Sequence, residues 1–217
     1  MKKLKESLIM SFSTFFSKQA RKPTGIFGRF YMSRVFEKGN AELNALVYEA
    51  LSIRKNDHIF EIGFGTGTLI KKIAEHLDSG LVEGIDFSKS MVAIAQKKNR
   101  NHINKGKVRI HLGDFDEVRF DDNCFDKIFS VNTIYFWKNP DTTISKICRI
   151  LKPEGKLFIG FHDKSEMEKM PLNREVFQYF STHELNELLS VHGSLNNIDI
   201  ISKKGNQQTC YCAVGTK

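Results

Sequence analysis

The sequence predicts an α/β protein with a doubly wound, mostly parallel sheet of seven strands closed by a C-terminal antiparallel β-hairpin. Three observations carry this prediction. Short apolar runs alternate with helical patterns along residues 58–162, as a sheet with crossover helices requires. A glycine-rich turn follows the first of these runs directly. Two further runs, 197–201 and 208–214, flank a Lys-Lys-Gly-Asn turn signal and predict the hairpin.

Residues 1–39 are expected to form a helical extension to a main domain of residues 40–217. Five apolar side chains recur there at helical spacing, opposite lysines: Leu4, Leu8, Phe12, Phe15 and Phe16. Such a helix can cap a pocket, pack on the domain or lie on a membrane surface, so peripheral membrane contact stays open. Pro23, Gly25 and Gly28 favour a hinged cap. An export signal is not expected, because no small-x-small cleavage site follows the apolar run.

The elements of the main domain follow from periodicity and from capping residues. Gly39 and Asn40 mark the end of one helix and the start of another over 41–51. Apolar runs predict strands at 58–62, 81–85, 107–112, 125–131 and 156–162. Helical patterns are expected between these strands, including 68–77, 88–99 and 144–151, and a further helix at 182–192. His111 is expected to pack inside the third strand.

Composition agrees with one large core and narrows the possible partners. The chain has 217 residues, 41% of them hydrophobic and 27% charged. Its four cysteines form no C-x-x-C pair, so neither a disulfide framework nor a metal site is predicted, and a cytoplasmic location is expected. No apolar run approaches the roughly 20 residues that cross a bilayer. The net charge is +8, yet the basic residues scatter along the chain, so nucleic acid is not the expected partner.

The glycine-rich turn predicts a nucleotide-type ligand. It reads I-F-E-I-G-F-G-T-G over residues 59–67, with an acid before its first glycine. Gly63, Gly65 and Gly67 allow positive φ and close approach of a ligand, and the following helix points its N-terminus at the same place. A threonine replaces the third glycine of the dinucleotide fingerprint, so that motif is not met. Asp86 ends the second strand about 20 residues later, where a carboxylate can bind ribose hydroxyls.

These residues resemble class I S-adenosylmethionine-dependent methyltransferases, in the small-molecule group that includes quinone and sterol methyltransferases. The resemblance covers roughly residues 40–217 and implies a Rossmann-like fold with S-adenosyl-L-methionine as cofactor. It implies that the glycine turn holds the methionine and ribose portion and that Asp114 and Phe115 meet the adenine. The full set of cofactor contacts expected on this basis is Glu61, Gly63, Gly65, Gly67, Asp86, Phe87, Asp114, Phe115, Ser130 and Asn132.

Candidate catalytic residues follow the fourth and fifth strands, because ligands of open α/β sheets sit beyond the carboxyl ends of the strands. His162 and Tyr135 are the two candidates, and an imidazole near its ordinary pKa suits a proton acceptor. A base is needed only when the acceptor must lose a proton. Tyr135, Phe136 and Trp137 are expected to form an aromatic wall that either packs in the core or shields a flat acceptor.

Missing motifs favour a small-molecule acceptor. The segment after the fourth strand, 130–137, lacks the Asn/Asp-Pro-Pro-aromatic motif with which several amino-methyltransferases grip a planar nitrogen. No Pro-Cys nucleophile for pyrimidine C5 chemistry and no appended RNA-binding module is present. Two alternatives stay open: an RNA methyltransferase, and a non-catalytic regulatory protein that binds the cofactor on the same scaffold.

Overall fold

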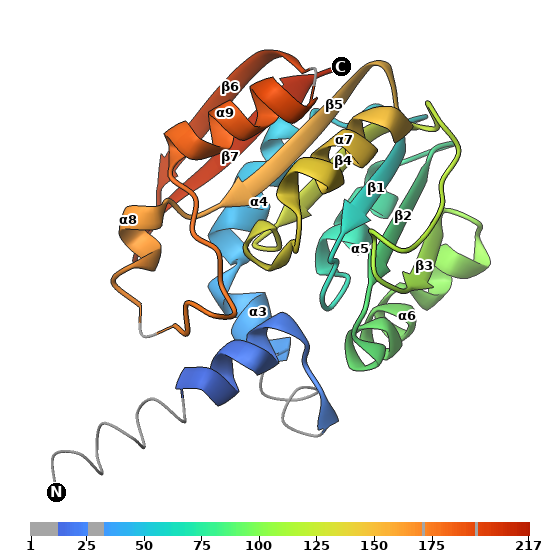
Figure 1. Cartoon of the computed structure of the whole chain (residues 1–217). Coiled ribbons are helices and arrows are strands. Elements are labelled where there is room, and N and C mark those ends of the chain that lie inside the picture. Colours follow the sequence, from blue (N-terminus) through green and yellow to red (C-terminus); the bar gives the residue numbers. More distant parts are fainter. Residues whose placement is uncertain (1–12, 26–32, 171, 194) are drawn as a thin grey trace, which may run out of the picture.

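A seven-stranded sheet lies between two helical layers in the computed structural model, which describes residues 13–25, 33–170, 172–193 and 195–217 (Figure 1). The strands are β1 (His58–Ile62), β2 (Leu81–Asp86), β3 (Val108–Leu112), β4 (Phe125–Val131), β5 (Leu151–Phe161), β6 (Asn196–Lys204) and β7 (Thr209–Thr216). Their order is β3-β2-β1-β4-β5-β7-β6. The first five run parallel, and β7 is antiparallel to both β5 and β6, as predicted.

Helices cover both faces of the sheet because its central strands are apolar on both sides. The helices are α3 (Ser33–Gly39), α4 (Ala41–Ala50), α5 (Thr68–His76), α6 (Lys89–Asn104), α7 (Pro140–Ile150), α8 (Lys164–Met167) and α9 (Thr182–Gly193). One core cluster joins α4, α5 and α6 to the sheet, and the other joins α7 and α9 to the opposite face. In β5, Leu157 and Ile159 belong to one cluster and Phe158 to the other, as alternation along a strand dictates.

Two elements differ from the sequence prediction. No helix connects β3 to β4; the segment 113–124 is a loop instead. Aromatic side chains of this loop fill the face where a helix would pack, with the ring of Phe120 centred 5.0 Å from that of Phe60. Strand β5 begins at Leu151 rather than at 156, because Leu151 already pairs with Phe125. The expected turn survives inside the strand, where Glu154 has a φ of +62°.

The prediction that His111 is packed in the core is wrong. Its side chain is 43% exposed, and its Nε2 lies 2.7 Å from Oε2 of Glu83 in the neighbouring strand. His58, from the strand on the other side, approaches Oε1 of Glu83 equally closely. Burial opposes ionisation of Glu83, but the hydrogen bonds and charges of His111 and His58 outweigh it and lower the pKa of this carboxyl to about 2.

The N-terminal segment lies across the sheet end at which the parallel strands stop (Figure 1). Residues 13–21 are helical, whereas residues 4–12 of the expected helix lie outside the described part of the chain. On one side, the backbone N–H of Asn173 donates to Ser17 Oγ over 2.9 Å. On the other, Ser88 Oγ donates to the carbonyl of Pro23 over 2.7 Å. The division of the chain at residue 39 stays a prediction, although α3 ends and α4 begins there as expected.

Within the described ranges, no helix has the length and apolar character needed to cross a membrane. The same residues contain no cluster of three or more histidine, cysteine or acidic side chains arranged to hold a metal ion. All four cysteines are free thiols. Cys210 and Cys212 alternate along β7 and are both buried in the same core cluster.

Two glycines with positive φ differ in how crowded their surroundings are, so substituting each by alanine distinguishes the cost of backbone strain from the cost of overpacking. Gly67 has φ +68°, and a Cβ there would lie 2.7 Å from that of Ala95 on α6. Gly106 has φ +72° with no atom within 4 Å of an added Cβ. Gly106→Ala should therefore lower the free energy of unfolding by about 1–2 kcal/mol. Gly67→Ala should lower it by a further 1–3 kcal/mol, roughly, through overpacking. Urea unfolding measures both, and equal losses would contradict the packing role of Gly67.

Candidate functional site

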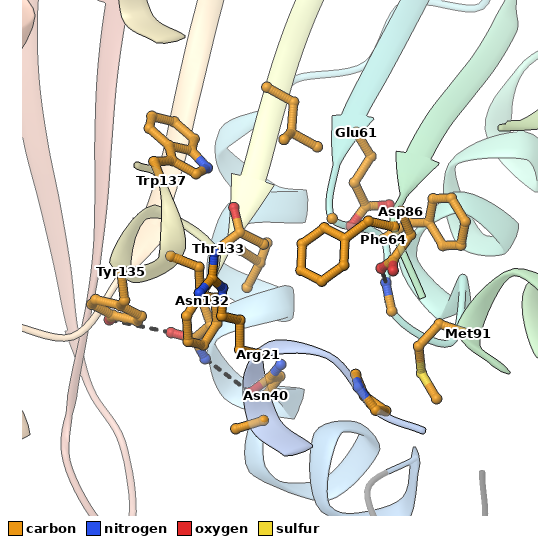
Figure 2. A pocket seen from close by; sticks show the side chains of 18 of the residues that line it. Arg21, Asn40, Glu61, Phe64, Asp86, Met91, Asn132, Thr133, Tyr135 and Trp137 are labelled. Atoms are coloured by element: carbon orange, nitrogen blue, oxygen red, sulfur yellow. Dashed lines mark hydrogen bonds between the residues drawn. The ribbon is translucent and has the colours of Figure 1, made fainter. Parts of the chain in front are cut away.

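A cavity of about 390 Å³ opens at the carboxyl ends of the parallel strands, the expected place for a ligand in such a sheet. Its wall comes from the turn after β1, the end of β2, the loop after β3, the segment after β4, the first residue after β5 and the N-terminal helix. Figure 2 shows Glu61, Phe64 and Asp86 on one side of this pocket and Asn132, Thr133 and Tyr135 on the other.

The glycine turn is shaped by both backbone and packing demands. Gly63, Gly65 and Gly67 all have positive φ, between 54° and 74°, which explains glycine at each position. Gly63 and Gly65 line the pocket, and a Cβ on Gly63 would lie only 2.5 Å from Cγ2 of Thr133. Gly67 does not line it; its carbonyl accepts a hydrogen bond from Asn99 Nδ2 over 3.0 Å. The sequence thus placed Gly67 in the ligand site, whereas the structure places it in the α5–α6 contact.

Two carboxyl groups meet at the floor of the pocket. Asp86 accepts hydrogen bonds from the backbone N–H of Gly65 (3.0 Å) and of Ser88 (2.8 Å). Burial raises the pKa of Asp86 to about 6 against the effect of these bonds. Glu61 is 3% exposed and its Oε2 has no hydrogen-bond partner. Burial, and then the charge of Asp86, raise the pKa of Glu61 to about 8. An orphaned buried oxygen beside a second carboxylate suits a ligand that brings positive charge.

The loop after β3 forms an aromatic wall. Asp114 and Phe115 line the pocket together with Phe87 from the end of β2. Phe115 is buried, and Lys146 Nζ lies 4.7 Å from the centre of its ring. Lys146 also donates hydrogen bonds to the carbonyls of Phe115 and Val118, so it fixes the loop. Nothing in the sequence marks this lysine, which sits on α7 about 30 residues away and reaches the loop only in the folded chain.

The structure separates the two polar residues expected after β4. Ser130 does not line the pocket; it is fully buried in the sheet, paired with Ile62 and Ile159 on the neighbouring strands. Asn132 does line it, with a φ of +55°. Its Nδ2 donates to Oδ1 of Asn40 over 2.8 Å (Figure 2). The structure thus places Ser130 outside the pocket lining, one residue before Val131, because its neighbours in the sheet enclose it.

Tyr135 and His162 lie together, but their polar atoms are already bonded within the chain. The Tyr135 hydroxyl accepts from the backbone N–H of His162 over 2.6 Å, and burial raises the pKa of this phenol. His162 Nδ1 lies 3.1 Å from the carbonyl of Thr209 and therefore carries the proton, because a carbonyl only accepts. His162 Nε2 then accepts from Gln208 Nε2, also over 3.1 Å. Burial lowers the pKa of His162 and favours this neutral imidazole.

One arm of the pocket is apolar and is formed by the N-terminal helix, the segment after β4 and the segment after β5. Its apolar lining residues are Phe16, Ala20, Phe136, Met167, Met170, Leu172 and Phe177. Trp137 stands at the edge of the pocket in Figure 2, and its buried indole N–H has no partner among the described residues. Of the expected aromatic wall, Tyr135 and Trp137 are buried in the core and also line the pocket, so the two interpretations are not exclusive.

Comparison with known proteins assigns this architecture to a family. Residues 60–159 match the family model described as methyltransferase domain. YrhH of Bacillus subtilis (strain 168), named as a methyltransferase, is 32% identical over 136 residues, which are 62% of this chain and 74% of YrhH. The chain belongs to this methyltransferase family. YdaC of the same organism, named an uncharacterized methyltransferase, is 27% identical over 182 residues, 82% of this chain and 93% of YdaC.

A solved structure shows the same fold for the methyltransferase. Haemonchus contortus phosphoethanolamine N-methyltransferase 2, in complex with phosphomonomethylethanolamine and S-adenosylhomocysteine, aligns with a TM-score of 0.72 at 18% identity. The alignment covers 88% of this chain and 58% of that one. The methyltransferase thus has the Rossmann-like class I fold, and its cofactor is S-adenosyl-L-methionine. The pocket fits that group: the orphaned oxygen of Glu61 matches a cationic ligand, and the Cβ-free turn at Gly63 and Gly65 leaves room for it.

The raised pKa of Glu61 predicts that the cofactor-free methyltransferase loses folding stability as the pH rises. Because the folded pKa (about 8) exceeds the ordinary 4.5, the stability linked to this group is complete below pH 4.5 and is lost as pH rises through 8. Glu61→Gln stays neutral. Its free energy of unfolding relative to wild type should therefore rise by roughly 2–3 kcal/mol between pH 5.5 and 9.

Urea unfolding at the two pH values measures this gain, and Glu83→Gln is the control of opposite sign. The pKa of Glu83 is lowered to about 2, so its ionised form already contributes stability above pH 4.5. The Glu83 variant should be destabilised at both pH 5.5 and pH 9, because it loses a carboxylate that accepts hydrogen bonds from His58 and His111. A Glu61 variant that shows no relative gain at pH 9 would contradict the burial of an ionisable carboxyl at that position.

Proposed function

We propose that the methyltransferase transfers the methyl group of S-adenosylmethionine to a small molecule with an apolar body and one polar group. The bound cofactor supplies a methyl group on a sulfonium, activated for in-line displacement. The residues proposed to hold it line the pocket: Asn132 on one side and, on the side of the glycine turn, Glu61, Gly63, Gly65, Asp86, Phe87, Asp114 and Phe115. The observation that carries the proposal is the buried, unpartnered carboxyl of Glu61 beside Asp86 at the base of a cavity otherwise rich in apolar side chains.

The acceptor is proposed to occupy the apolar arm. Met167, Met170 and Leu172 come from the segment after β5, and Phe16 and Ala20 face them from the N-terminal helix. Such a surface binds by excluding water from an apolar body. A polynucleotide fits this arm poorly, because its phosphates would need cationic partners that these side chains do not offer. In the Haemonchus structure the bound acceptor-side molecule is also small, phosphomonomethylethanolamine.

The bonding of His162 and Tyr135 narrows the chemistry of the acceptor. Neither side chain is free to remove a proton, since the Tyr135 hydroxyl is engaged with the backbone and His162 Nε2 accepts from Gln208. An acceptor that is already nucleophilic, such as an amine, a thiolate or a carboxylate, needs no such step. An acceptor hydroxyl would have to displace the Gln208 amide before it could donate to His162 Nε2. We propose His162 as a base only in that second case, and Tyr135 as the group that holds His162 in place.

Loss of the Asp86 carboxylate should weaken cofactor binding. Asp86→Asn removes a charged acceptor at the ribose position proposed for it, and the affinity for S-adenosylhomocysteine should fall on the order of 10- to 100-fold. Asp199→Asn is the matched control, because Asp199 is exposed on β6. Calorimetric titration measures both variants, with thermal unfolding to verify folding. No heat from wild type at millimolar ligand, or undiminished affinity in Asp86→Asn, would overturn the proposed cofactor contacts.

Methyl transfer should appear in small molecules. With labelled cofactor and cell extract divided into low-mass, RNA and protein fractions, wild type and Asp199→Asn should label the low-mass fraction. Asp86→Asn should not, and Leu172→Asp should label it more slowly while keeping cofactor affinity, because Leu172 lines only the apolar arm. Label that ribonuclease removes would favour an RNA methyltransferase instead. Absence of label from all fractions would favour a regulatory protein.

A further inference from the structure

The cationic side chain of Arg21 enters the pocket without a partner in the part of the chain that the structure describes. Arg21 ends the N-terminal helix and lines the pocket, and Figure 2 shows its side chain pointing inward, beside Asn132 and Thr133. No hydrogen bond or ion pair joins its guanidinium to any residue within the described ranges. Glu37, an acid of the same wall, is already bound by Lys98. An arginine that faces a cavity while the nearby acid is paired elsewhere is suited to an anionic ligand.

A chain of hydrogen bonds adds a second donor at the same place. Tyr135 accepts from the backbone N–H of His162, so its own proton must be donated onward. Two acceptors lie 3.3 Å from this hydroxyl, Asn132 Oδ1 and the carbonyl of His162. Asn132 Nδ2 donates to Asn40 Oδ1 over 2.8 Å. The amide nitrogen of Asn40 is thereby left as a donor, and Asn40 lines the pocket. No acceptor among the described residues is bonded to this nitrogen.

We propose that Arg21 and the amide nitrogen of Asn40 form a carboxylate-binding subsite, which the N-terminal helix completes by placing Arg21 in the pocket. The planar guanidinium presents paired N–H donors that match the two oxygens of a carboxylate. The inference rests on the proposed function, since it concerns the same pocket. The carboxylate comes from one of two sources: the amino-acid end of the cofactor, or an acceptor whose apolar body fills the arm beside it.

The position of the subsite explains why either source reaches it. Asn132 lies at the edge of β4, directly across the pocket from the glycine turn, where the proposed cofactor site ends. Ala20, the residue before Arg21, already belongs to the apolar arm. The helix is held in place by Ser17 on one side and Pro23 on the other, so Arg21 is presented from an anchored segment. The subsite therefore stands at the junction of the two halves of the pocket.

The experiment measures binding to the whole protein in two arms. The first titrates wild type, Arg21→Gln and Arg21→Lys with S-adenosylhomocysteine and with decarboxylated S-adenosylmethionine, which keeps the ammonium and lacks the carboxylate. The second titrates the S-adenosylhomocysteine-loaded proteins with octanoate and with neutral octanamide. Arg34→Gln is the matched control, because Arg34 is exposed on α3. Thermal unfolding verifies that each variant is folded.

If the carboxylate belongs to the cofactor, Arg21→Gln should weaken the binding of S-adenosylhomocysteine on the order of 10- to 100-fold and leave the binding of decarboxylated S-adenosylmethionine unchanged. If the carboxylate belongs to the acceptor, Arg21→Gln should keep its affinity for the cofactor. It should then lose affinity for octanoate to a similar extent, but not for octanamide. In either case the affinity of Arg21→Lys for the affected ligand should lie between those of wild type and Arg21→Gln. Lysine keeps the positive charge but lacks the paired N–H donors of the guanidinium. If Arg21→Gln matches Arg34→Gln for all four ligands, the subsite is refuted while cofactor binding stands. Wild type that binds no S-adenosylhomocysteine refutes the proposed function itself.

Discussion

The carboxylate of Asp86 joins three segments that lie far apart in the sequence. It ends β2, accepts the backbone N–H of Gly65 in the turn after β1, and accepts that of Ser88 at the start of α6. Ser88 in turn donates its hydroxyl to Pro23 of the N-terminal segment. A hydrogen bond to an ionised acceptor is among the stronger ones in a protein. The pocket floor, the start of α6 and the N-terminal segment are thus positioned by the carboxylate of Asp86 and its neighbour Ser88.

The same group makes the pocket electrostatically unfavourable in the absence of a ligand. Glu61 is buried and Asp86 is half-buried, and both have raised pKa values. The fold keeps them close because β1 and β2 are adjacent and parallel, with Glu61 in register with Gly84 and Asp86 two residues beyond. A site of this kind trades stability of the empty protein for affinity toward a cationic ligand. The loop after β3, which Lys146 fixes, completes the wall.

Sequence reasoning was most successful where local signals and the global fold agree. Apolar runs predicted the strands of the parallel sheet and the final hairpin, and the glycine turn predicted where the pocket opens. It was wrong where tertiary packing replaced a local preference. Phe115 and Phe120 fill the face on which a helix between β3 and β4 would pack. His111 is drawn to a neighbouring glutamate instead of the core, because a strand at the edge of the sheet is only half covered.

By itself, the sequence determined the fold class, the ligand turn and the acids that flank it, because these depend on residues close together in the chain and on periodicities of two and 3.6. Only the tertiary structure decided which of them face the cavity. It turned Gly67 toward α6 and enclosed Ser130 in the sheet. It also bonded Nε2 of His162 to a glutamine of the β6–β7 turn, and it brought Arg21 into the same pocket as the glycine turn. Such contacts arise from chain reversals that no local pattern encodes, since many distant partners are compatible with the same side chain.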